Sequence, residues 1–212
     1  MRKVIEDFST MKEESLLSMF VWKGRKLSEP DDKRLTRSRC MIAGIVGKWL
    51  EAKWSYYPDH LMHKKLLQQY ARHLDERRVD GQGIYVCGVS GTGKTFGSIL
   101  LAKEVIRRDG FPFVIRYSDL FEIVTEREEI YQRVRLTPFL IVDDLGAGSA
   151  KQTVAAMFEE LLRYREIYKL ATIISSNMNK VELISGFGAP FVRVLEDTCP
   201  AIEFTEGFYA ST

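Results

Sequence analysis

The sequence predicts an α/β fold in which a parallel sheet carries helices on both faces. Short apolar segments alternate along the chain with segments of helical period. The apolar segments are continuous, which is typical of strands that are buried on both faces. A glycine-rich loop, GVSGTGKT, follows one of these strands and precedes a helix. These three observations together predict a three-layer αβα core.

In the first half of this pattern, residues 61–74 have helical period and residues 83–88 form a short apolar strand. A helix is expected at 94–108, because four apolar residues share one face at helical spacing: Ile99, Ala102, Val105 and Ile106. A second strand is expected at 111–117. Strands that alternate with helices in this way are expected to run parallel.

In the second half, Ser118 and Asp119 are expected to cap a helix that runs to about Arg135, since short polar side chains accept hydrogen bonds from the first N–H groups of a helix. Residues 139–142 are fully apolar and residues 172–175 are apolar and β-branched, so both segments predict buried strands. The remaining expected elements are helices at 153–168 and 187–196 and a last strand at 201–204.

The composition is that of a globular protein with one hydrophobic core. The chain has 212 residues, of which 45% are hydrophobic and 28% charged, and its net charge of +2 does not by itself indicate a nucleic-acid partner. No CxxC pair occurs, so a zinc site is not expected, and the odd number of cysteines argues against a disulfide framework: Cys40, Cys87 and Cys199. No apolar run suits a signal sequence or a membrane span, so we expect a cytoplasmic protein without membrane contact.

The glycine-rich loop matches the phosphate-binding pattern GxxxxGK[ST] in its expected context, between a strand and a helix. Glycines let main-chain N–H groups wrap around an anion, and the helix adds its positive N-terminal end. Lys94 can reach the β- and γ-phosphates, and the Thr95 hydroxyl can ligate Mg²⁺. The sequence therefore predicts a P-loop site for a nucleoside triphosphate, held by Gly88, Val89, Ser90, Gly91, Thr92, Gly93, Lys94 and Thr95.

One further glycine, Gly97, lies inside the helix that follows the loop. Glycine within a helix costs about 1 kcal/mol relative to alanine. A residue with that cost is expected where another group packs too closely for a side chain, so we expect close packing at Gly97.

Two carboxylates follow the apolar strand in FLIVDDLG, at the strand end where ligands bind in open α/β sheets. Asp143 is placed to hold Mg²⁺, directly or through water. Asp144 is placed to orient the attacking water as polariser or general base. The alternative is that the two aspartates simply end a strand in a turn. The phosphate loop upstream favours the metal and water roles.

Asn177 ends the strand in TIISSN. Its amide is expected to orient the lytic water and to sense the γ-phosphate. The alternative is that Asn177 caps the next helix, a position where asparagine is common.

Residues 1–60 are expected to form a small, helical and basic region that binds a partner, ahead of the main domain at 61–212. This region contains an amphipathic stretch, Phe8–Trp22, and a group of basic residues: Lys23, Arg25, Lys26, Lys33, Arg34, Arg37 and Arg39. It also contains aromatic residues interleaved with Lys48 and Lys53, namely Trp49, Trp54, Tyr56 and Tyr57. These rings can stack on bases, lie in the core or pack near the adenine of the nucleotide, and packing is favoured over stacking.

In this order and spacing, the motifs resemble the AAA+ ATPases of the DnaC/DnaI helicase-loader type: GVSGTGKT, LIVDDLG, TIISSN and GFGAPFVRVLED. IstB-type transposition helpers share the pattern. The resemblance covers about residues 61–205, and its most specific marks are the double aspartate, the pair Arg163-Tyr164 and the Ser-Asn pair. It implies an AAA+ fold that hydrolyses ATP with Mg²⁺.

The resemblance also implies an assembly. Arg193 is then the residue that completes the ATP site of a neighbouring subunit, so ATP lies at the interfaces of a homo-oligomer; the alternative is a surface arginine on an amphipathic helix. The family further implies binding of single-stranded DNA and delivery of a replicative helicase, which the N-terminal region contacts. An alternative function is that of an IstB-like helper that acts on duplex DNA with a transposase. A third is a binding module in which ATP only sets a conformation.

Two local features bear on these expectations. Family members often end in a Gly-x-Ser-Tyr-Arg-like tail, but this chain reads Gly207-Phe208-Tyr209-Ala210, so neither a sensor arginine nor a C-terminal helical lid is expected and turnover is expected to be slow or partner-dependent. Three arginines are expected either to line a DNA channel or to form a solvated face balanced by glutamates: Arg127, Arg133 and Arg135.

Overall fold

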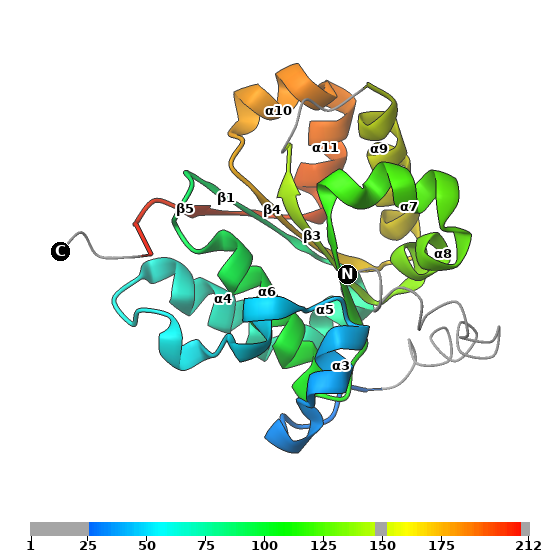
Figure 1. Cartoon of the computed structure of the whole chain (residues 1–212). Coiled ribbons are helices and arrows are strands. Elements are labelled where there is room, and N and C mark those ends of the chain that lie inside the picture. Colours follow the sequence, from blue (N-terminus) through cyan, green and yellow to red (C-terminus); the bar gives the residue numbers. More distant parts are fainter. Residues whose placement is uncertain (1–25, 147–151, 209–212) are drawn as a thin grey trace.

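A five-stranded parallel sheet forms the middle layer of the structure (Figure 1). The computed structural model describes residues 26–146 and 152–208. The strand order is β2-β3-β4-β1-β5, and every neighbouring pair is parallel. The strands are β1 (Ile84–Gly88), β2 (Pro112–Arg116), β3 (Phe139–Leu145), β4 (Ala171–Ser176) and β5 (Ala201–Phe204).

Helices cover both faces of the sheet. One face carries α3 (Arg37–Ile42), α4 (Met62–Arg72), α5 (Leu74–Asp80) and α6 (Lys94–Arg107). The other face carries α7 (Leu120–Glu126), α8 (Glu128–Leu136), α9 (Gln152–Ile167), α10 (Lys180–Phe187) and α11 (Ala189–Thr198). Short 3₁₀ turns are η1 (Asp32–Arg34), η2 (Gly47–Glu51), η3 (Trp54–Tyr56) and η4 (Tyr117–Asp119). The predicted three-layer αβα class is confirmed.

Successive strand residues serve two separate hydrophobic clusters, because side chains alternate across a sheet. On β3, Ile141 belongs to the cluster around α6, whereas Val142 belongs to the cluster around α9. Both side chains are 0% exposed. This double burial explains why the strands read as continuous apolar runs in the sequence.

The predicted elements are present, but two long helices are divided. The helix expected at 61–74 corresponds to α4, which ends at Arg72. A second helix, α5, begins at Leu74, directly after His73. The helix expected at 118–135 breaks at Arg127, whose φ of −135° and ψ of 66° are not helical. The expected cap at Ser118 and Asp119 is wrong: the Asp119 carboxylate accepts hydrogen bonds from Arg116 and Ser118 instead of from the helix.

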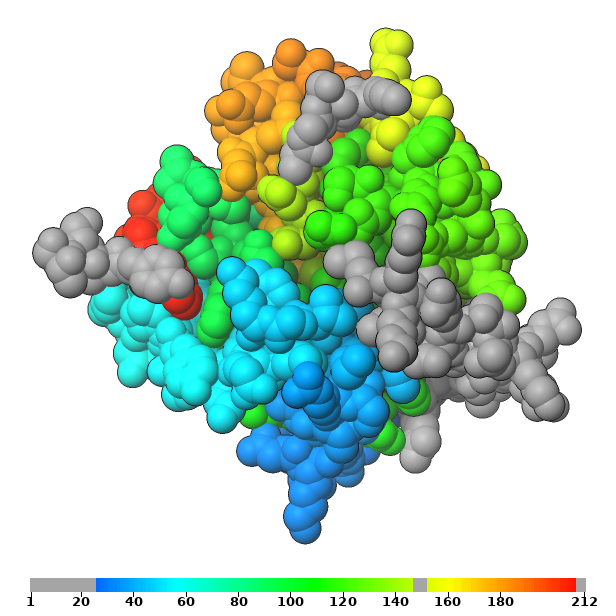
Figure 2. Space-filling model, viewed as in Figure 1, coloured from blue at the N-terminus to red at the C-terminus, as the bar shows by residue number. Residues whose placement is uncertain are grey.

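The segment 26–60 packs against α6. The Lys103 Nζ donates to the carbonyl oxygens of Leu50 and Ala52, each at 2.7 Å, and the Trp54 Nε1 donates to a Glu104 oxygen at 2.7 Å. Figure 2 shows this segment, from blue into cyan, beside the cyan residues that follow it in the chain. The division of the chain at residue 60 stays a prediction.

The aromatic and basic residues of this segment are partly engaged in packing. Tyr57 is 1% exposed, so for this ring the packing interpretation is confirmed, whereas Tyr56 is 58% exposed. Arg34 donates to the Glu29 and Arg107 carbonyl oxygens, and Arg39 pairs with Asp109 at 3.1 Å. The predicted stretch Phe8–Trp22, together with Lys23 and Arg25, lies outside the described residues.

The expected close packing at Gly97 is confirmed. A Cβ atom at this position would lie 2.4 Å from the Cδ1 of Leu67 on α4. Leu67 is 0% exposed, and the absence of a side chain at Gly97 lets α4 and α6 approach each other closely at this point. Within the described ranges, none of the helices combines the length and the apolar character that a membrane crossing requires.

Candidate nucleotide-binding site

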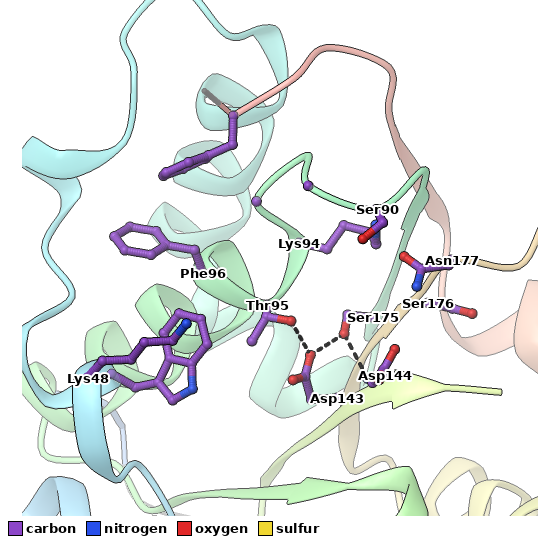
Figure 3. Close-up of a pocket in the computed structure, with 14 residues that line it drawn as sticks. Lys48, Ser90, Lys94, Thr95, Phe96, Asp143, Asp144, Ser175, Ser176 and Asn177 are labelled. Atoms are coloured by element: carbon purple, nitrogen blue, oxygen red, sulfur yellow. Dashed lines mark hydrogen bonds between the residues drawn. The ribbon is translucent and has the colours of Figure 1, made fainter. Parts of the chain in front are cut away.

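The candidate site lies where three strands end. The phosphate-binding loop follows β1, the two aspartates end β3 and Asn177 follows β4, and β4 lies between β1 and β3 in the sheet. The carboxyl ends of parallel strands meet at one edge, where α/β sheets bind ligands. A cavity of about 450 Å³ opens there (Figure 3), and its lining comprises Lys48, Trp49, Ser90, Gly91, Gly93, Lys94, Thr95, Phe96, Asp143, Asp144, Ser175, Ser176, Asn177 and Phe208.

The loop has the backbone that its glycines predict. Gly88, Gly91 and Gly93 have φ values of 138°, 82° and 87°, in the region that side chains disfavour. A Cβ atom on Gly88 would lie 2.3 Å from the carbonyl oxygen of Phe204 on β5. The loop then leads into α6, whose first residue is Lys94. The main chain therefore has the shape of an anion-binding loop at a helix N-terminus.

Lys94 lies inside the curve of the loop. Its Nζ donates to the carbonyl oxygens of Gly88 at 2.7 Å and Val89 at 2.6 Å. The side chain is 7% exposed, and this burial lowers the pKa of Lys94, while the charges of Asp144 and Asp143 act in the opposite direction. Among the described residues the ammonium also donates to the Thr92 hydroxyl at 3.4 Å, so its partners are neutral oxygens that a charged phosphate oxygen can replace.

A comparison of two loop glycines gives the first prediction. Alanine at Gly91 is expected to cost about 1–2 kcal/mol, because an L-residue is strained at positive φ. Alanine at Gly93 should cost roughly 1–3 kcal/mol more, since overpacking adds to the strain. The reason is that a Cβ atom at Gly93 would lie 2.3 Å from the Phe208 ring, whereas one at Gly91 meets nothing within 4 Å. Urea denaturation without nucleotide measures both values.

The control for this prediction is Phe208→Ala. In the Gly93→Ala background it should remove the extra cost, because the clashing ring is gone, and in the Gly91→Ala background it should not. Equal costs for Gly91→Ala and Gly93→Ala would show that the Phe208 ring does not restrict the loop.

Asp143 is held between two hydroxyl groups. Thr95 donates to its Oδ1 at 2.9 Å, and Ser175 donates to the same oxygen, as the dashed lines in Figure 3 show. Burial raises the pKa of Asp143, and these two hydrogen bonds act to lower it. A threonine hydroxyl and a carboxylate side by side are hard oxygen ligands of the kind that Mg²⁺ prefers. The residues present therefore fit the predicted metal site.

Asp144 points differently from Asp143 because the strand is irregular there. The pairing of β3 with β4 shifts register between Val142 and Leu145, and Asp144 has a φ of 61°. Such a backbone costs on the order of 1 kcal/mol or more outside glycine, although aspartate tolerates it better than most residues. The bulge leaves the Asp144 side chain exposed at the cavity, where it can contact a ligand or water.

Asn177 lines the cavity beside Ser90 of the loop, with an exposed side chain (Figure 3). The helix-capping alternative does not apply to this residue. The cap of α10 is Asn179, whose side chain accepts from the Glu182 N–H at 3.0 Å, while Glu182 accepts from the Asn179 N–H. Asn177 therefore has no capping duty, and its predicted role at the γ-phosphate stays a prediction.

Arg193 lies away from these residues. It is on α11 with an exposed side chain, and it does not line the cavity. Within residues 26–146 and 152–208 it forms no ion pair. This position agrees with a role in trans and equally with an ordinary surface arginine, so the predicted role in trans remains a prediction.

The far end of the cavity is apolar; packing near the adenine is among the expectations for Trp49, whereas Phe96 and Phe208 were not expected in the site. Phe96 packs 6.3 Å from Trp49 and 5.1 Å from Phe208, measured between ring centroids. The Lys48 Nζ lies 4.7 Å from the centroid of the Trp49 ring. The Phe208 N–H donates to the Gly91 carbonyl oxygen at 3.1 Å, which fixes this ring beside the loop. The only signal in the sequence was the pairing of Lys48 with Trp49 among aromatic residues.

The three arginines expected as a DNA-facing group do not share one environment. Arg133 is 5% exposed, its Nη2 donates to the Ile42 carbonyl oxygen at 2.8 Å, and its guanidinium stacks 4.2 Å from the Phe113 ring. Burial lowers its pKa to about 10. Arg135 stacks 4.0 Å from the Tyr164 ring, and Arg127 pairs with Glu122. The expectation of a common basic face is wrong for Arg133, which is a packing residue.

Comparisons with known proteins agree with this geometry. No protein-family model matches the chain. The chain is 29% identical over 110 residues to the replicative helicase loader DnaI of Bacillus subtilis (strain 168), a match that covers 49% of this chain and 35% of DnaI. The similarity thus takes in about a third of that curated relative.

Solved structures of the same fold include a helicase loader and a replication initiator. A crystal structure of DnaI matches with a TM-score of 0.66 and 23% identity, covering 76% of this chain and 92% of that one. The DnaC helicase loader matches with a TM-score of 0.68 and 16% identity, covering 76% and 100%. The replication initiator DnaA bound to AMPPCP and single-stranded DNA matches with 0.56 and 18% identity, covering 76% and 47%. The predicted resemblance to the DnaC/DnaI helicase loaders is therefore confirmed, and the chain has the AAA+ fold of these nucleotide-binding P-loop proteins.

Proposed function

We propose that this protein is a cytoplasmic helicase loader of DNA replication that binds and hydrolyses ATP. The observation that carries the proposal is the meeting of the phosphate loop, the pair Thr95–Asp143 and Asn177 around one cavity. The cavity has the size of a small-molecule site, for which roughly 300–1,000 Å³ is usual. Its polar end suits a triphosphate, and its aromatic end suits a base.

Each group at the polar end has a task in phosphoryl transfer. The loop N–H groups and Lys94 hold the phosphates, and Thr95 and Asp143 hold Mg²⁺. When bound, Mg²⁺ would offset the negative charge of the phosphate oxygens. Asp144 accepts a hydrogen bond from the attacking water and orients it, and Asn177 contacts the γ-phosphate region. Arg193 of a neighbouring subunit adds a further positive charge near the γ-phosphate, beside that of Lys94.

The proposed assembly and partners follow from the relatives. DnaI and DnaC are helicase loaders, and the DnaA structure contains single-stranded DNA. We therefore propose that ATP joins copies of this chain into an oligomer that binds single-stranded DNA, and that residues 1–60 contact a replicative helicase. The matched relatives are replication proteins, so they support the loader over the transposition helper.

Two variants separate ATP binding from hydrolysis. Lys94→Ala is expected to weaken ATP binding about 100-fold, because a charge-assisted contact to phosphate contributes up to about 3 kcal/mol. Asp144→Asn should retain binding and assembly but lose roughly 10²- to 10⁴-fold in turnover, the usual contribution of a positioned base. Calorimetry measures binding, mass measurement with a slow ATP analogue measures assembly, and phosphate release measures turnover.

The same mass measurement tests the rest of the proposal. Assembly should increase with single-stranded DNA and not with duplex DNA, and the replicative helicase of the same cell should join the complex. Assembly that requires duplex DNA would support the transposition helper instead. Particles that stay monomeric with every nucleotide would contradict the shared ATP site.

A further inference from the structure

The hydroxyl group of Ser175 touches both aspartates of the site. Ser175 lies on β4, next to β3 in the sheet, and is 2% exposed. Its Oγ donates to Asp143 Oδ1 and accepts from the main-chain N–H of Asp144 at 3.1 Å (Figure 3). We propose that Ser175 is a positioning residue that sets the orientation of the Mg²⁺-binding carboxylate and of the turn that carries Asp144. This inference rests on the proposed ATP and Mg²⁺ site.

The two hydroxyl groups on Asp143 have different duties. Both donate to Oδ1, and the main-chain N–H of Asp144 also acts on this carboxylate, so that these hydrogen bonds together lower the pKa of Asp143 against the effect of burial. Thr95 is itself assigned to the metal, and its oxygen then faces the cation. Ser175 has no such second duty, because its oxygen is occupied by the Asp144 N–H. Ser175 is therefore the group that can keep the carboxylate in place in both states of the site.

The bond from Asp144 gives Ser175 a second effect. The N–H of Asp144 lies in the bulge of β3, where φ is 61°, and Ser175 is its acceptor. A strained backbone persists only where its surroundings determine it. Asn177 follows the end of β4 at Ser176 and lines the same cavity as Ser175. Ser175 therefore holds Asp143 and the Asp144 turn in one arrangement, close in the chain to the predicted γ-phosphate contact.

The adjacent serine shows that this is a property of Ser175 and not of any serine at the strand end. The Ser176 Oγ donates to the Leu145 carbonyl oxygen at 2.7 Å and accepts from the Met178 N–H at 3.0 Å. It joins β4 to β3 and to the following turn, but it contacts neither carboxylate.

The test measures how much Mg²⁺ strengthens ATP binding, as the ratio of the dissociation constants without and with Mg²⁺. In Ser175→Ala this ratio should fall about 10- to 100-fold, as is usual when a group that orients a metal ligand is removed. Binding of ATP without Mg²⁺ should stay within twofold of the unaltered protein. Ser175→Thr keeps the hydroxyl and should retain most of the ratio.

The matched control is Thr172→Val, which removes a hydroxyl from the same buried strand. Thr172 is 3% exposed and accepts from Arg165 Nε at 2.8 Å, far along β4 from the aspartates. This variant should lose stability but keep the Mg²⁺ ratio.

The outcomes separate the inference from the function on which it rests. An unchanged ratio in Ser175→Ala overturns the inference alone, and so does an equal loss in Thr172→Val. If Ser175→Ala does not fold, Ser175→Thr decides: a lost ratio in that folded protein contradicts the inference. Failure of the unaltered protein to bind ATP overturns the proposed function itself.

Discussion

Arg193→Ala is expected to lower ATP turnover about a thousandfold or more, the usual contribution of an arginine supplied to a phosphoryl-transfer site. The loss should appear in turnover and not in ATP binding by a single subunit. Arg193 is exposed on α11 and does not line its own cavity, so it has no route to the nucleotide of its own subunit. Steady-state phosphate release at saturating ATP measures the effect.

Mixing two inactive variants tests whether Arg193 acts in trans. Arg193→Ala keeps an intact cavity, and Asp144→Asn keeps an intact Arg193. In a mixed oligomer the cavity of the first meets the arginine of the second, and at equal amounts roughly a quarter of the interfaces are complete, because head-to-tail contacts pair unlike surfaces. Turnover should therefore return to about that fraction of the unaltered rate.

The control is a double variant that carries both substitutions. Mixed with Arg193→Ala, it supplies neither the base nor the arginine, so turnover should stay at the level of Arg193→Ala alone. Recovery of turnover in this control would mean that the recovery in the first mixture does not depend on Arg193 from a neighbouring subunit. An Arg193→Ala protein with unreduced turnover would show that the residue is an ordinary surface arginine, the alternative that the sequence leaves open.

The parts of the fold and the site that depend on neighbouring residues could be predicted from the sequence. The loop between β1 and α6 is a local motif, and its positive-φ glycines lie where the pattern requires them. The apolar strands and the two aspartates after β3 are also local signals. The break at Arg127 was missed because helical period continues across it, and α10 was missed because its capping box of Asn179 and Glu182 was not recognised.

The parts that depend on distant residues could not be predicted in the same way. Phe208 lies beside Gly91 and Trp49 beside Phe96, although more than forty residues separate each pair in the chain. The bond from Ser175 to Asp143 depends on β4 lying next to β3, which strand and helix alternation alone does not determine. Arginine is usually found at the surface, yet Arg133 is buried, where it donates to the Ile42 carbonyl oxygen and stacks on the Phe113 ring. In each case the sheet order and the packing decide the contact.

Arg165 is the strongest example of such a contact. It is 1% exposed, and burial lowers its pKa to about 9. Within the described residues no carboxylate pairs with it. Its guanidinium instead donates to one hydroxyl and four carbonyl oxygens: Thr172 Oγ1 at 2.8 Å, Val134 O at 2.9 Å, Arg135 O at 3.2 Å, Thr137 O at 3.0 Å and Ala171 O at 2.7 Å.

These acceptors explain how a buried charge is tolerated. Val134 and Arg135 are in the last turn of α8, where free carbonyl groups carry the negative end of the helix dipole. Ala171 and Thr172 begin β4. Arg165 therefore joins the end of α8 to the start of β4 from its own position on α9, so one side chain connects three elements.

Arg165→Met is expected to destabilise the fold by about 3–5 kcal/mol, because buried acceptors that lose their donor cost roughly 1–3 kcal/mol each and some of them can relax. Methionine fills much of the volume but leaves four carbonyl groups and a hydroxyl without this donor. A loss of that size should lower the melting temperature by roughly 6 to 20 °C in a domain of this length. Thermal unfolding followed by circular dichroism measures it, with urea unfolding as a second probe.

Arg163→Met on the same helix is the matched control. Arg163 is exposed and pairs with Glu159 at 2.7 Å, one turn earlier, and such surface pairs contribute about 0.3–0.5 kcal/mol. Its melting temperature should therefore change by no more than about 2 °C. Arg165→Lys restores the charge but not the fork of donors, so it should recover only part of the loss. Equal stability of the two methionine variants would mean that the carbonyl groups around Arg165 find other donors, and that α8 and β4 are joined by apolar packing alone.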